Sequence, residues 1–488
     1  MAEKQERIID QILALTDVKK IITELTKDQD YIPIAEVNQE EYDGKHKILN
    51  RDNKEIGEGD TAKTVITAKL VTTFQKLITN LAVAFLIGRP VKYVLDSEDN
   101  TEEAFSSIKS VFDGNKMQYF DRKIARATMI ETRAAELWYA RNDTFDSENP
   151  LKPGDPGYVG SKIGVQLLSL KNGFKLYPHF DQYGDMDAFT VTYDMDVFDK
   201  TTGKVVQEAR TDVYTADATY KYVEAAGGAK LEETVENPFG KIPIIYYAQE
   251  DSEWSDVQSL IDRYEDLISN HADENDYYAS PMIKVKGKLV EMPDKTQTGK
   301  MLKFDAVPSP DQKSLLYGDA EYLTWDQEPE SLKLEGNNLR DLIYTLTSTP
   351  DVSFSSVKGI STLSGIALKL LFFDATLKSM NHQEVFGEGF MRRVNLVKEI
   401  VAFTAVASEE QIRSVEVTVK FQDPTPQDIA ENIKMLTEGR AGQPVMSEKT
   451  ALRNNLLVTD VGEEEEQMEE ERKQEAASFG FEAGSFNV

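Results

Sequence analysis

The sequence predicts an α+β protein with long helices, a mostly antiparallel sheet and a small strand-containing insert between two of the helices. Apolar residues recur at helical spacing over much of the chain, whereas residues 165–224 change to a period of two. A glycine-containing loop, Val352 to Ile360, leads into a helical run that reaches about Ala407. These three observations define the expected fold class.

The N-terminal third is expected to be mostly helical. The first thirty residues are amphipathic and the next thirty are polar, so residues 1–62 are interpreted as a helix followed by an irregular arm. A helix is expected from Lys63 to Gly88, where Gly88-Arg-Pro90 ends it. Further elements are a strand over 91–95 and helices over 102–112 and 119–141.

The middle of the chain predicts an antiparallel sheet. A loop dense in Asp, Gly and Pro over residues 142–161 precedes it, and Asp199 to Gly203 supplies a hairpin turn. The sheet is expected to end at Asn237 to Pro243. Its strands are rich in β-branched and aromatic residues and are expected at 165–170, 189–198, 204–214 and 221–224.

Two amphipathic helices, over 252–279 and 331–347, flank a strand-like insert over 282–325. Between Ala279 and Leu315, seven lysines outnumber four acids, a local excess of +3 in a chain of formal net charge −30. A lysine-rich solvent edge that discourages strand aggregation and a docking surface for an acidic partner or DNA explain this excess equally well. The candidates for docking are Lys284, Lys286 and Lys288.

The loop before the long helix is the most distinctive local feature. Ser361 and Ser364 are both placed to cap first-turn amides. An apolar stripe over residues 363–380 resumes out of phase beyond Gly387 and Gly389, which predicts a kink in the middle of the helix. A loop that opens into a long bent helix is an architectural feature and not a catalytic one.

The C-terminal part begins with a strand expected over 415–422 and helices over 426–439 and 447–457. From Asp460 onward, nine of sixteen residues are acidic. Blocks of like charge repel one another, so residues 461–488 are expected to form a solvated, disordered tail.

Composition narrows the class of protein. The 488 residues are 40% hydrophobic and 29% charged, which is ordinary for a soluble protein. The sequence contains no cysteine, and this absence excludes disulfides and thiolate chemistry. Neither a signal peptide nor a membrane span is expected. We therefore expect an intracellular product. The charge of −30 disfavours phosphate binding over the whole surface; it suits either solubility or a surface past which DNA moves without adhering.

No catalytic motif, cofactor site or metal site is predicted. The four histidines are scattered, and no phosphate-binding glycine loop or nucleophile elbow occurs. One group of acids has spacing suited to two metal ions, as in phosphodiester cleavage, although a strand with a polar outer face gives the same spacing. This group is Asp181, Asp185, Asp187, Asp194 and Asp196.

Three blocks in order resemble a known family: Ala84-Phe-Leu-Ile-Gly-Arg-Pro-Val91, Asn237-Pro-Phe-Gly-Lys-Ile-Pro243 with Ser252 to Ser269, and Ser364-Gly-Ile-Ala-Leu-Lys369. The chain resembles the portal proteins of tailed bacteriophages, in particular the Gp6-like siphophage group. The last block is the most specific. The resemblance implies a non-enzymatic protein with a portal-type fold, assembled as a ring of twelve subunits.

The resemblance also implies a domain plan for the chain. The N-terminal residues 1–62 would border a wing domain of residues 63–250. Residues 348–364 would form a tunnel loop, whose channel-facing residues would be Asp351, Ser353, Lys358 and Thr362. Ser361, Ser364 and Gly365 would form the hinge to the helix. The remaining parts are stem helices over 251–279 and 331–347, a small clip of mixed helix and strand (α/β) over 280–330, the bent helix and return to the wing over 365–422, a crown over 423–460 and the tail over 461–488.

In such a family the partners are other copies of the chain, terminase, a head-completion or adaptor protein, scaffold, major capsid protein and double-stranded DNA passing without sequence specificity. The expected location is the virion, at the portal vertex of the capsid, after assembly in the host bacterial cytoplasm. The alternatives are a metal-dependent nucleic-acid enzyme of the packaging machinery and another ring protein of the phage neck.

Overall fold

The computed structural model of the chain describes residues 7–56, 63–96, 102–141, 162–199, 203–225, 228–278, 283–286, 288–291, 303–305, 307–308, 315–316, 319–322, 329–351, 370–404, 409–423, 429–440, 445–455, 457–458 and 461–482. The chain divides into two compact units. Residues Met1–Pro350 and Asp374–Asp423 form the first, and Asp351–Phe373 and Pro424–Val488 form the second. Among the helices so described, none is long and apolar enough to cross a membrane.

The N-terminal part of the first unit contains three helices, α1 (Ile8–Leu13), α2 (Val18–Leu25) and α3 (Tyr31–Asp43). The prediction of a single helix here is wrong, because Asp17 caps the start of a second helix, α2. The Asp17 side chain accepts a hydrogen bond from the Lys19 amide at 3.0 Å. Helix α3 lies where an irregular arm is expected, and it ends at Gly44 in the left-handed conformation.

The next elements belong to the main core. Strands β1 (Lys54–Ile56) and β2 (Lys63–Val65) pair, so the helix predicted from Lys63 begins only with α4 (Phe74–Ile87), which ends before Gly88 as expected. Strand β3 (Lys92–Leu95) and helix α5 (Glu102–Gly114) confirm their predictions. Helix α6 (Met117–Glu131) completes this group, and its buried Ile124 and Met129 join the largest apolar cluster.

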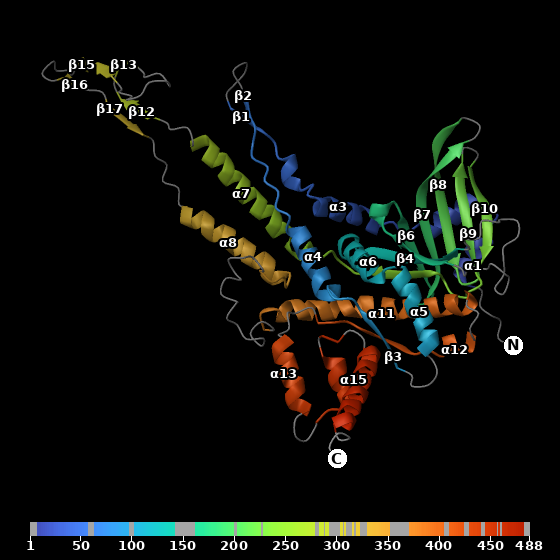
Figure 1. The fold of residues 1–488 in the computed structure, drawn as a ribbon. Helices are drawn as coiled ribbons and strands as arrows, with labels where there is room; N and C mark the ends of the chain where they lie inside the picture. The colour runs from blue at the N-terminus through green and yellow to red at the C-terminus, as the bar shows by residue number, and fades with distance from the viewer. Residues whose placement is uncertain are drawn as a thin grey trace. The chain divides into compact units, whose positions relative to one another are not determined.

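Two antiparallel sheets lie beside these helices (Figure 1). One has the strand order β10-β9-β8-β7-β6 and the other the order β11-β4-β5. The four predicted strands are confirmed, whereas β6, β10 and β11 are missed. The strand bounds are β4 (Arg133–Arg141), β5 (Lys162–Leu168), β6 (Lys175–Phe180), β7 (Met186–Asp199), β8 (Lys204–Thr215), β9 (Ala218–Ala225), β10 (Gly228–Glu236) and β11 (Ile244–Ala248).

Strand β4 corrects the helix predicted over residues 119–141. Helix α6 ends at Thr132, whose φ of +65° is left-handed, and β4 begins at the next residue. β4 is the central strand of its sheet, and Ala134, Ala135 and Trp138 are buried there. Its alanines favour a helix in isolation, but pairing on both edges overrides that local preference.

Helices α7 (Gln258–Tyr278) and α8 (Pro329–Leu346) pack together and flank the insert, as predicted (Figure 1). Gly336 faces Leu267 across the pair, where an added Cβ would make an ordinary contact at 3.7 Å, and Arg263 Nη2 lies 2.7 Å from Glu335 Oε1. The described residues of the insert hold strands but no helix, so the expected helical component is not found among them. The pairs are β12 (Ile283–Lys286) with β17 (Asp319–Tyr322), β13 (Lys288–Glu291) with β14 (Lys303–Asp305), and β15 (Val307–Pro308) with β16 (Leu315–Leu316).

An extended segment, residues 66–73, runs along α7 and is held by side chains of that helix. The amides of alternate residues in the segment bond to every fourth residue of α7: Ala68 to Asp273 at 2.6 Å, Leu70 to Ser269 at 2.9 Å and Thr72 to Glu265 at 2.7 Å. Two residues of extended chain rise about 6.6 Å and four residues of helix about 6 Å, so the two repeats stay in register. The segment therefore fixes α7 to the N-terminal part of the unit.

Helix α11 (Phe373–Thr404) is followed by α12 (Glu409–Arg413) and by β18 (Val417–Lys420), which pairs with β3. The helix is continuous through Gly387 and Gly389, and the kink expected there stays a prediction (Figure 1). Gly389 serves close packing, because a Cβ at this position would overlap the ring of Tyr247 on β11.

A buried cluster around Arg393, the Arg393 cluster, joins α11 to both α6 and the three-stranded sheet. Arg393 Nη1 lies 2.7 Å from Asp121 Oδ1, and Nε donates to Glu136 Oε2 at 3.0 Å. Nη1 also donates to the Tyr93 hydroxyl at 3.0 Å, and the Tyr247 hydroxyl donates to Glu136 at 2.7 Å. Burial raises the pKa of Asp121 to about 6, because the attraction of Arg393 only partly offsets desolvation and the Glu136 charge.

The second unit contains α13 (Ile429–Arg440), α14 (Glu448–Asn454) and α15 (Val461–Glu482). Helix α15 corrects the disordered tail expected from residue 461, and residues 483–488 lie outside the described part. Glutamate is a good helix former, and basic residues offset part of the repulsion within the acidic run. These ion pairs are Lys449 with Glu465 at 3.4 Å, Lys473 with Glu469 at 3.5 Å, and Arg472 with Glu448.

Candidate functional site

The candidate site is the base of the loop that separates α8 from α11. Helix α8 ends in two bonds typical of a Schellman motif: Ser348 N–H donates to Thr345 O at 3.1 Å, and Thr349 N–H donates to Tyr344 O at 2.9 Å. Ser348 takes the left-handed position with φ of +51°, where glycine is usual. The chain is thus turned sharply as it leaves the helix toward Pro350.

The chain leaving the loop returns to the same place. Lys378, in the second turn of α11, donates to the Thr347 carbonyl at 3.1 Å, and its Nζ lies 2.7 Å from Oε2 of Glu253. His382, one turn further along, places Nε2 3.2 Å from Oε1 of the same carboxylate. We call Glu253, Thr347, Lys378 and His382 the loop anchor. It joins the turn before α7, the end of α8 and the start of α11.

Glu253 carries the electrostatics of the loop anchor, since its side chain is only 3% exposed. Burial alone would raise the pKa of this carboxyl. The hydrogen bond with His382 and the charge of Lys378 outweigh burial and lower the pKa of Glu253 to about 2. The carboxylate is therefore ionised at neutral pH and holds the α11 end of the loop, and Lys378 links it to the α8 end through the Thr347 carbonyl.

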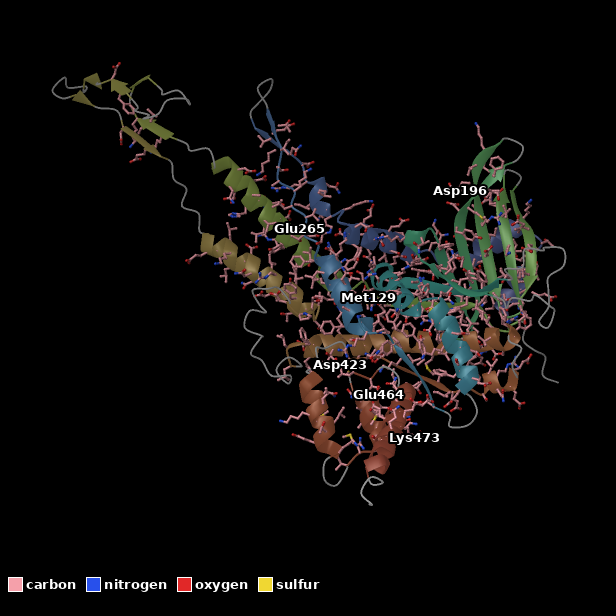
Figure 2. All side chains as sticks on the ribbon, viewed as in Figure 1. Met129, Asp196, Glu265, Asp423, Glu464 and Lys473 are labelled. Carbon is pink, nitrogen blue, oxygen red and sulfur yellow. The ribbon has the colours of Figure 1, made fainter. Side chains whose placement is uncertain are left out.

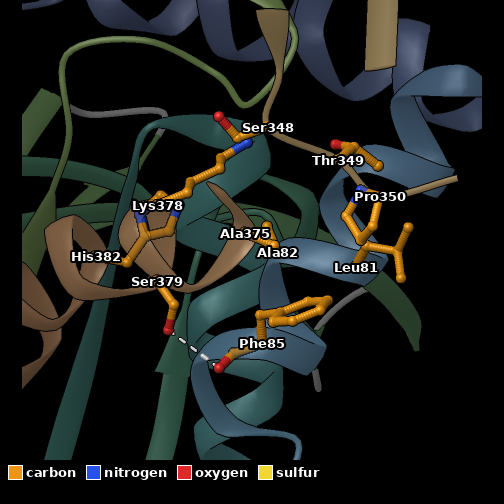
Figure 3. Close-up of a pocket in the computed structure, with 10 residues that line it drawn as sticks. All are labelled: Leu81, Ala82, Phe85, Ser348, Thr349, Pro350, Ala375, Lys378, Ser379 and His382. Carbon is orange, nitrogen blue, oxygen red and sulfur yellow. Dashed lines mark hydrogen bonds between the residues drawn. The ribbon is translucent and has the colours of Figure 1, made fainter. Parts of the chain in front are cut away.

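Two spaces of very different size lie beside the loop anchor. Figure 3 shows a cavity of about 10 Å³ among Lys378, His382, Ser348 and Thr349, which is room for about one water molecule. Ser379 closes one side of it by donating to the Phe85 carbonyl at 3.0 Å. An open groove of about 400 Å³ lies on the other side of the anchor and is lined largely by polar residues of the same segments. This arrangement positions the base of the loop.

The channel-facing and hinge residues are placed only in part. Asp351 is half-buried at the end of the described part of the loop. The other candidates lie outside the described residues: Ser353, Lys358, Ser361, Thr362, Ser364 and Gly365. Their roles stay predictions.

The three candidate docking lysines lie on strands of the insert, each directly opposite an acid. Lys284 and Lys286 are exposed on β12. The register places Lys284 opposite Glu321, Lys286 opposite Asp319 and Lys288 opposite Asp305. The excess of +3 counted to Leu315 therefore omits two acids of β17 that face two of the lysines. The insert presents paired charges of both signs, rather than a uniformly basic surface.

The acids considered for metal binding do not form a site. Asp181 accepts from the amides of Tyr183 and Asp185 at 2.8 and 3.0 Å, as a turn residue does. Asp194 and Asp196 are exposed on β7, near the end of the five-stranded sheet where Figure 2 labels Asp196. Across the described ranges, no three His, Cys, Asp or Glu side chains gather closely enough to hold a metal ion.

Sequence reasoning missed the loop anchor. Lys378 and His382 stand four residues apart on the long helix, which is a visible signal, but Glu253 is more than a hundred residues earlier. A single acid beside Trp254 in a chain with 85 acidic residues gives no reason to select it. Only the packing of three distant segments identifies this carboxylate.

The chain matches the sequence profile of one protein family. The profile described as "Phage portal protein, SPP1 Gp6-like" matches residues 23–478. Curated proteins give no match.

Two solved structures are similar in part. The first, "Neck of native GTA particle computed with C12 symmetry", is 11% identical with a TM-score of 0.37, covering 79% of this chain and 89% of that one. The second, "Virion of native gene transfer agent (GTA) particle", is 10% identical with a TM-score of 0.36, covering 84% of this chain and 98% of that one.

Proposed function

The chain belongs to the SPP1 Gp6-like family of phage portal proteins, and we propose that it forms a closed ring at one capsid vertex through which double-stranded DNA enters and leaves. This family is structural, and the proposed role involves no catalysis. Residues 23–478 match the family, which is nearly the whole chain. The proposal therefore concerns nearly all of the given chain and not one domain of it.

The order of the described elements is the observation that carries the proposal. Two packed helices, α7 and α8, flank a small strand insert, and a loop then leads to the long helix α11. We assign the helix pair to the stem, the insert to the clip, residues 348–364 to the tunnel loop and residues 423–460 to the crown. In this assignment the loop anchor holds the tunnel loop at both ends while DNA moves past it.

Charge supports a passive conduit. Twelve copies of −30 carry a net charge of roughly −360, which disfavours adhesion of the DNA phosphates. Head-to-tail contacts between different surfaces close such a ring. The proposed location is the virion, after assembly in the host cytoplasm.

Electron microscopy and light scattering of the purified protein test the ring. Twelve copies of 55.0 kDa predict a particle of roughly 660 kDa with a central hole. A monomer that cleaves DNA in the presence of Mg²⁺ would contradict the proposal and favour the enzyme alternative.

The clip is proposed to dock terminase and, later, a head-completion protein. Because its lysines face acids, reversing the lysines alone would place like charges opposite each other and destabilise the strand pair. A swap keeps the pairing while moving the charges: Lys284→Glu with Glu321→Lys, and Lys286→Glu with Asp319→Lys. We expect the swapped protein to form rings but to lose terminase binding in a pull-down assay. Binding at the wild-type level would reject these lysines as the docking residues.

A further inference from the structure

The exposed side of α11 changes its chemical character along the helix. Leu370, which comes just before the helix, and Phe373, Leu377 and Met380 follow one another at steps of three and four residues, and each is at least 45% exposed. Continuing along the same side, the next exposed residues are charged, Glu384 and Glu388, and they are followed by exposed Met391 and Asn395. A side that faces only water has no reason to change in this way, so the apolar part, which we call the α11 row, is a surface suited to a partner.

A second apolar row lies on α8. Leu334, Leu342 and Leu346 are each at least 46% exposed, and exposed Asn338 completes a row of residues four apart. We call these four residues the α8 row. The neighbouring helix α7 differs, because its exposed positions are polar: Ser259, Arg263, Asp266 and Asn270. The contrast between two packed helices again marks one side of one helix as suited to a partner.

The two rows are of similar length. The α8 row spans twelve residue steps, about 18 Å of helix, and the α11 row spans ten, about 15 Å. A ring with head-to-tail contacts needs two different matching patches on every copy, and these two rows lie on different helices of one chain. Each copy also repels the next through its charge of −30, so the contact between copies needs apolar burial.

We propose that the α11 row of one copy packs against the α8 row of the next copy in the ring. This inference rests on the proposed ring function and names the surfaces that build it. DNA is excluded as the occupant because its phosphates offer nothing to four large apolar side chains. Residues 352–369 of the same chain are the competing occupant of the α11 row, and they would leave the α8 row uncovered.

Three variants test the pairing. The α11 variant is Leu377→Glu with Met380→Glu, and the α8 variant is Leu334→Glu with Leu342→Glu. The matched control is Met391→Glu with Asn395→Glu, which adds two glutamates at exposed positions further along α11. Mass is measured by light scattering and by native mass spectrometry, and far-ultraviolet circular dichroism confirms that each variant is folded.

The wild type and the control are expected at roughly 660 kDa, and each row variant alone at 55.0 kDa. An equimolar mixture of the two row variants should form a dimer of roughly 110 kDa (2 × 55.0 kDa) and nothing larger, because one intact interface remains between them. Serine in place of each introduced glutamate gives milder variants, in which the concentration needed for assembly should rise at least tenfold.

Several outcomes would overturn the pairing while leaving the ring function intact. One is ring formation by either row variant at wild-type concentration. An α8 variant that assembles while the α11 variant does not would point to residues 352–369 as the occupant. A mixture that stays monomeric while the wild type forms rings would reject the match between the two rows. A wild type that is itself monomeric would instead reject the proposed function.

Discussion

Helix α11 carries two ion clusters that differ in composition. In the Arg393 cluster, one cation faces two carboxylates, Asp121 and Glu136, and the Arg393 side chain is 0% exposed. In the loop anchor, one carboxylate, Glu253, faces the two basic side chains of Lys378 and His382, which are partly exposed. The first joins α11 to the core, and the second joins its beginning to the loop.

The difference indicates what each cluster is suited to do. A fully buried cluster with extensive hydrogen bonds loses several kcal/mol when one partner is removed, because the remaining charges cannot reach water. In the loop anchor, Lys378 is 20% exposed and has a partial route to solvent, so a rearrangement there costs less. One end of the helix is therefore fixed and the other is adjustable.

The two clusters also respond to pH in opposite directions. Asp121 has its pKa raised from 3.8 to about 6, so the folded state binds its proton more tightly and this stabilisation is lost as the pH rises from about 4 to 6. Glu253 has its pKa lowered from 4.5 to about 2, so its stabilisation is present above pH 4.5 and is lost as the pH falls toward 2.

The largest expected effect is at Arg393. Arg393→Met should lower the free energy of unfolding by about 3–5 kcal/mol, because it leaves two buried carboxylates without their cation. Denaturant unfolding followed by circular dichroism, at one fixed protein concentration, measures this. The adjacent Arg392→Met is the control; its side chain is exposed and pairs only with exposed Glu388, so a change within about 0.5 kcal/mol is expected. Equal losses in both variants would contradict the special role of the buried cluster.

The next effect is at Glu253. Glu253→Gln should cost about 3 kcal/mol at pH 7, the free energy that corresponds to its pKa shift, and the cost should shrink as the pH falls from 4.5 toward 2. Unfolding curves for the variant and wild type across this pH range measure the difference. Asp256→Asn, at an exposed position in the same turn, should show no such pH dependence. A cost at Glu253 that is constant with pH would mean that packing, rather than charge, fastens the loop.

A third effect concerns the two glycines of α11. Gly389→Ala should destabilise the protein by about 1–3 kcal/mol, because the added methyl group displaces Tyr247, whose hydroxyl bonds to Glu136 in the Arg393 cluster. At Gly387 an added Cβ would meet only Phe421 at 3.6 Å, an ordinary contact. Gly387→Ala should therefore be neutral or stabilising by up to about 1 kcal/mol. Similar effects at both positions would instead favour the prediction that the two glycines serve a kink in the helix.

Much of the element order could be predicted from the sequence, because periodicity is a local property. Helices α5, α7 and α8 and strands β7 and β8 carry clear patterns, and their predictions are confirmed. Strand β10 was missed since nearly all of its residues are exposed and four of its nine residues are charged, so no alternation of apolar and polar residues is visible. Strand β4 was missed because Thr132 takes the left-handed position that ends α6, where the sequence offers no glycine as a signal.

The candidate sites were less predictable than the fold. The clip lysines were selected from local composition, but the acids opposite them become apparent only from the strand register, and the docking role of the lysines stays a prediction. The loop anchor depends on contacts between residues far apart in the sequence, which no local pattern encodes. The loop itself was recognised through a resemblance, and that resemblance named residues of which only Asp351 lies in the described part.

The smallest effect tests the strained end of α8 beside the loop anchor. Ser348 has φ of +51°, a conformation that costs a residue with a Cβ more than it costs glycine. Ser348→Gly should therefore raise the free energy of unfolding by about 0.5–1 kcal/mol, after allowance for the greater freedom of glycine in the unfolded chain. Thr345→Gly is the matched control; Thr345 lies within α8, where glycine costs about 1 kcal/mol, so the opposite sign is expected. If both variants are destabilised, the Ser348 side chain itself contributes to the loop anchor, and the anchor is less adjustable than its exposure indicates.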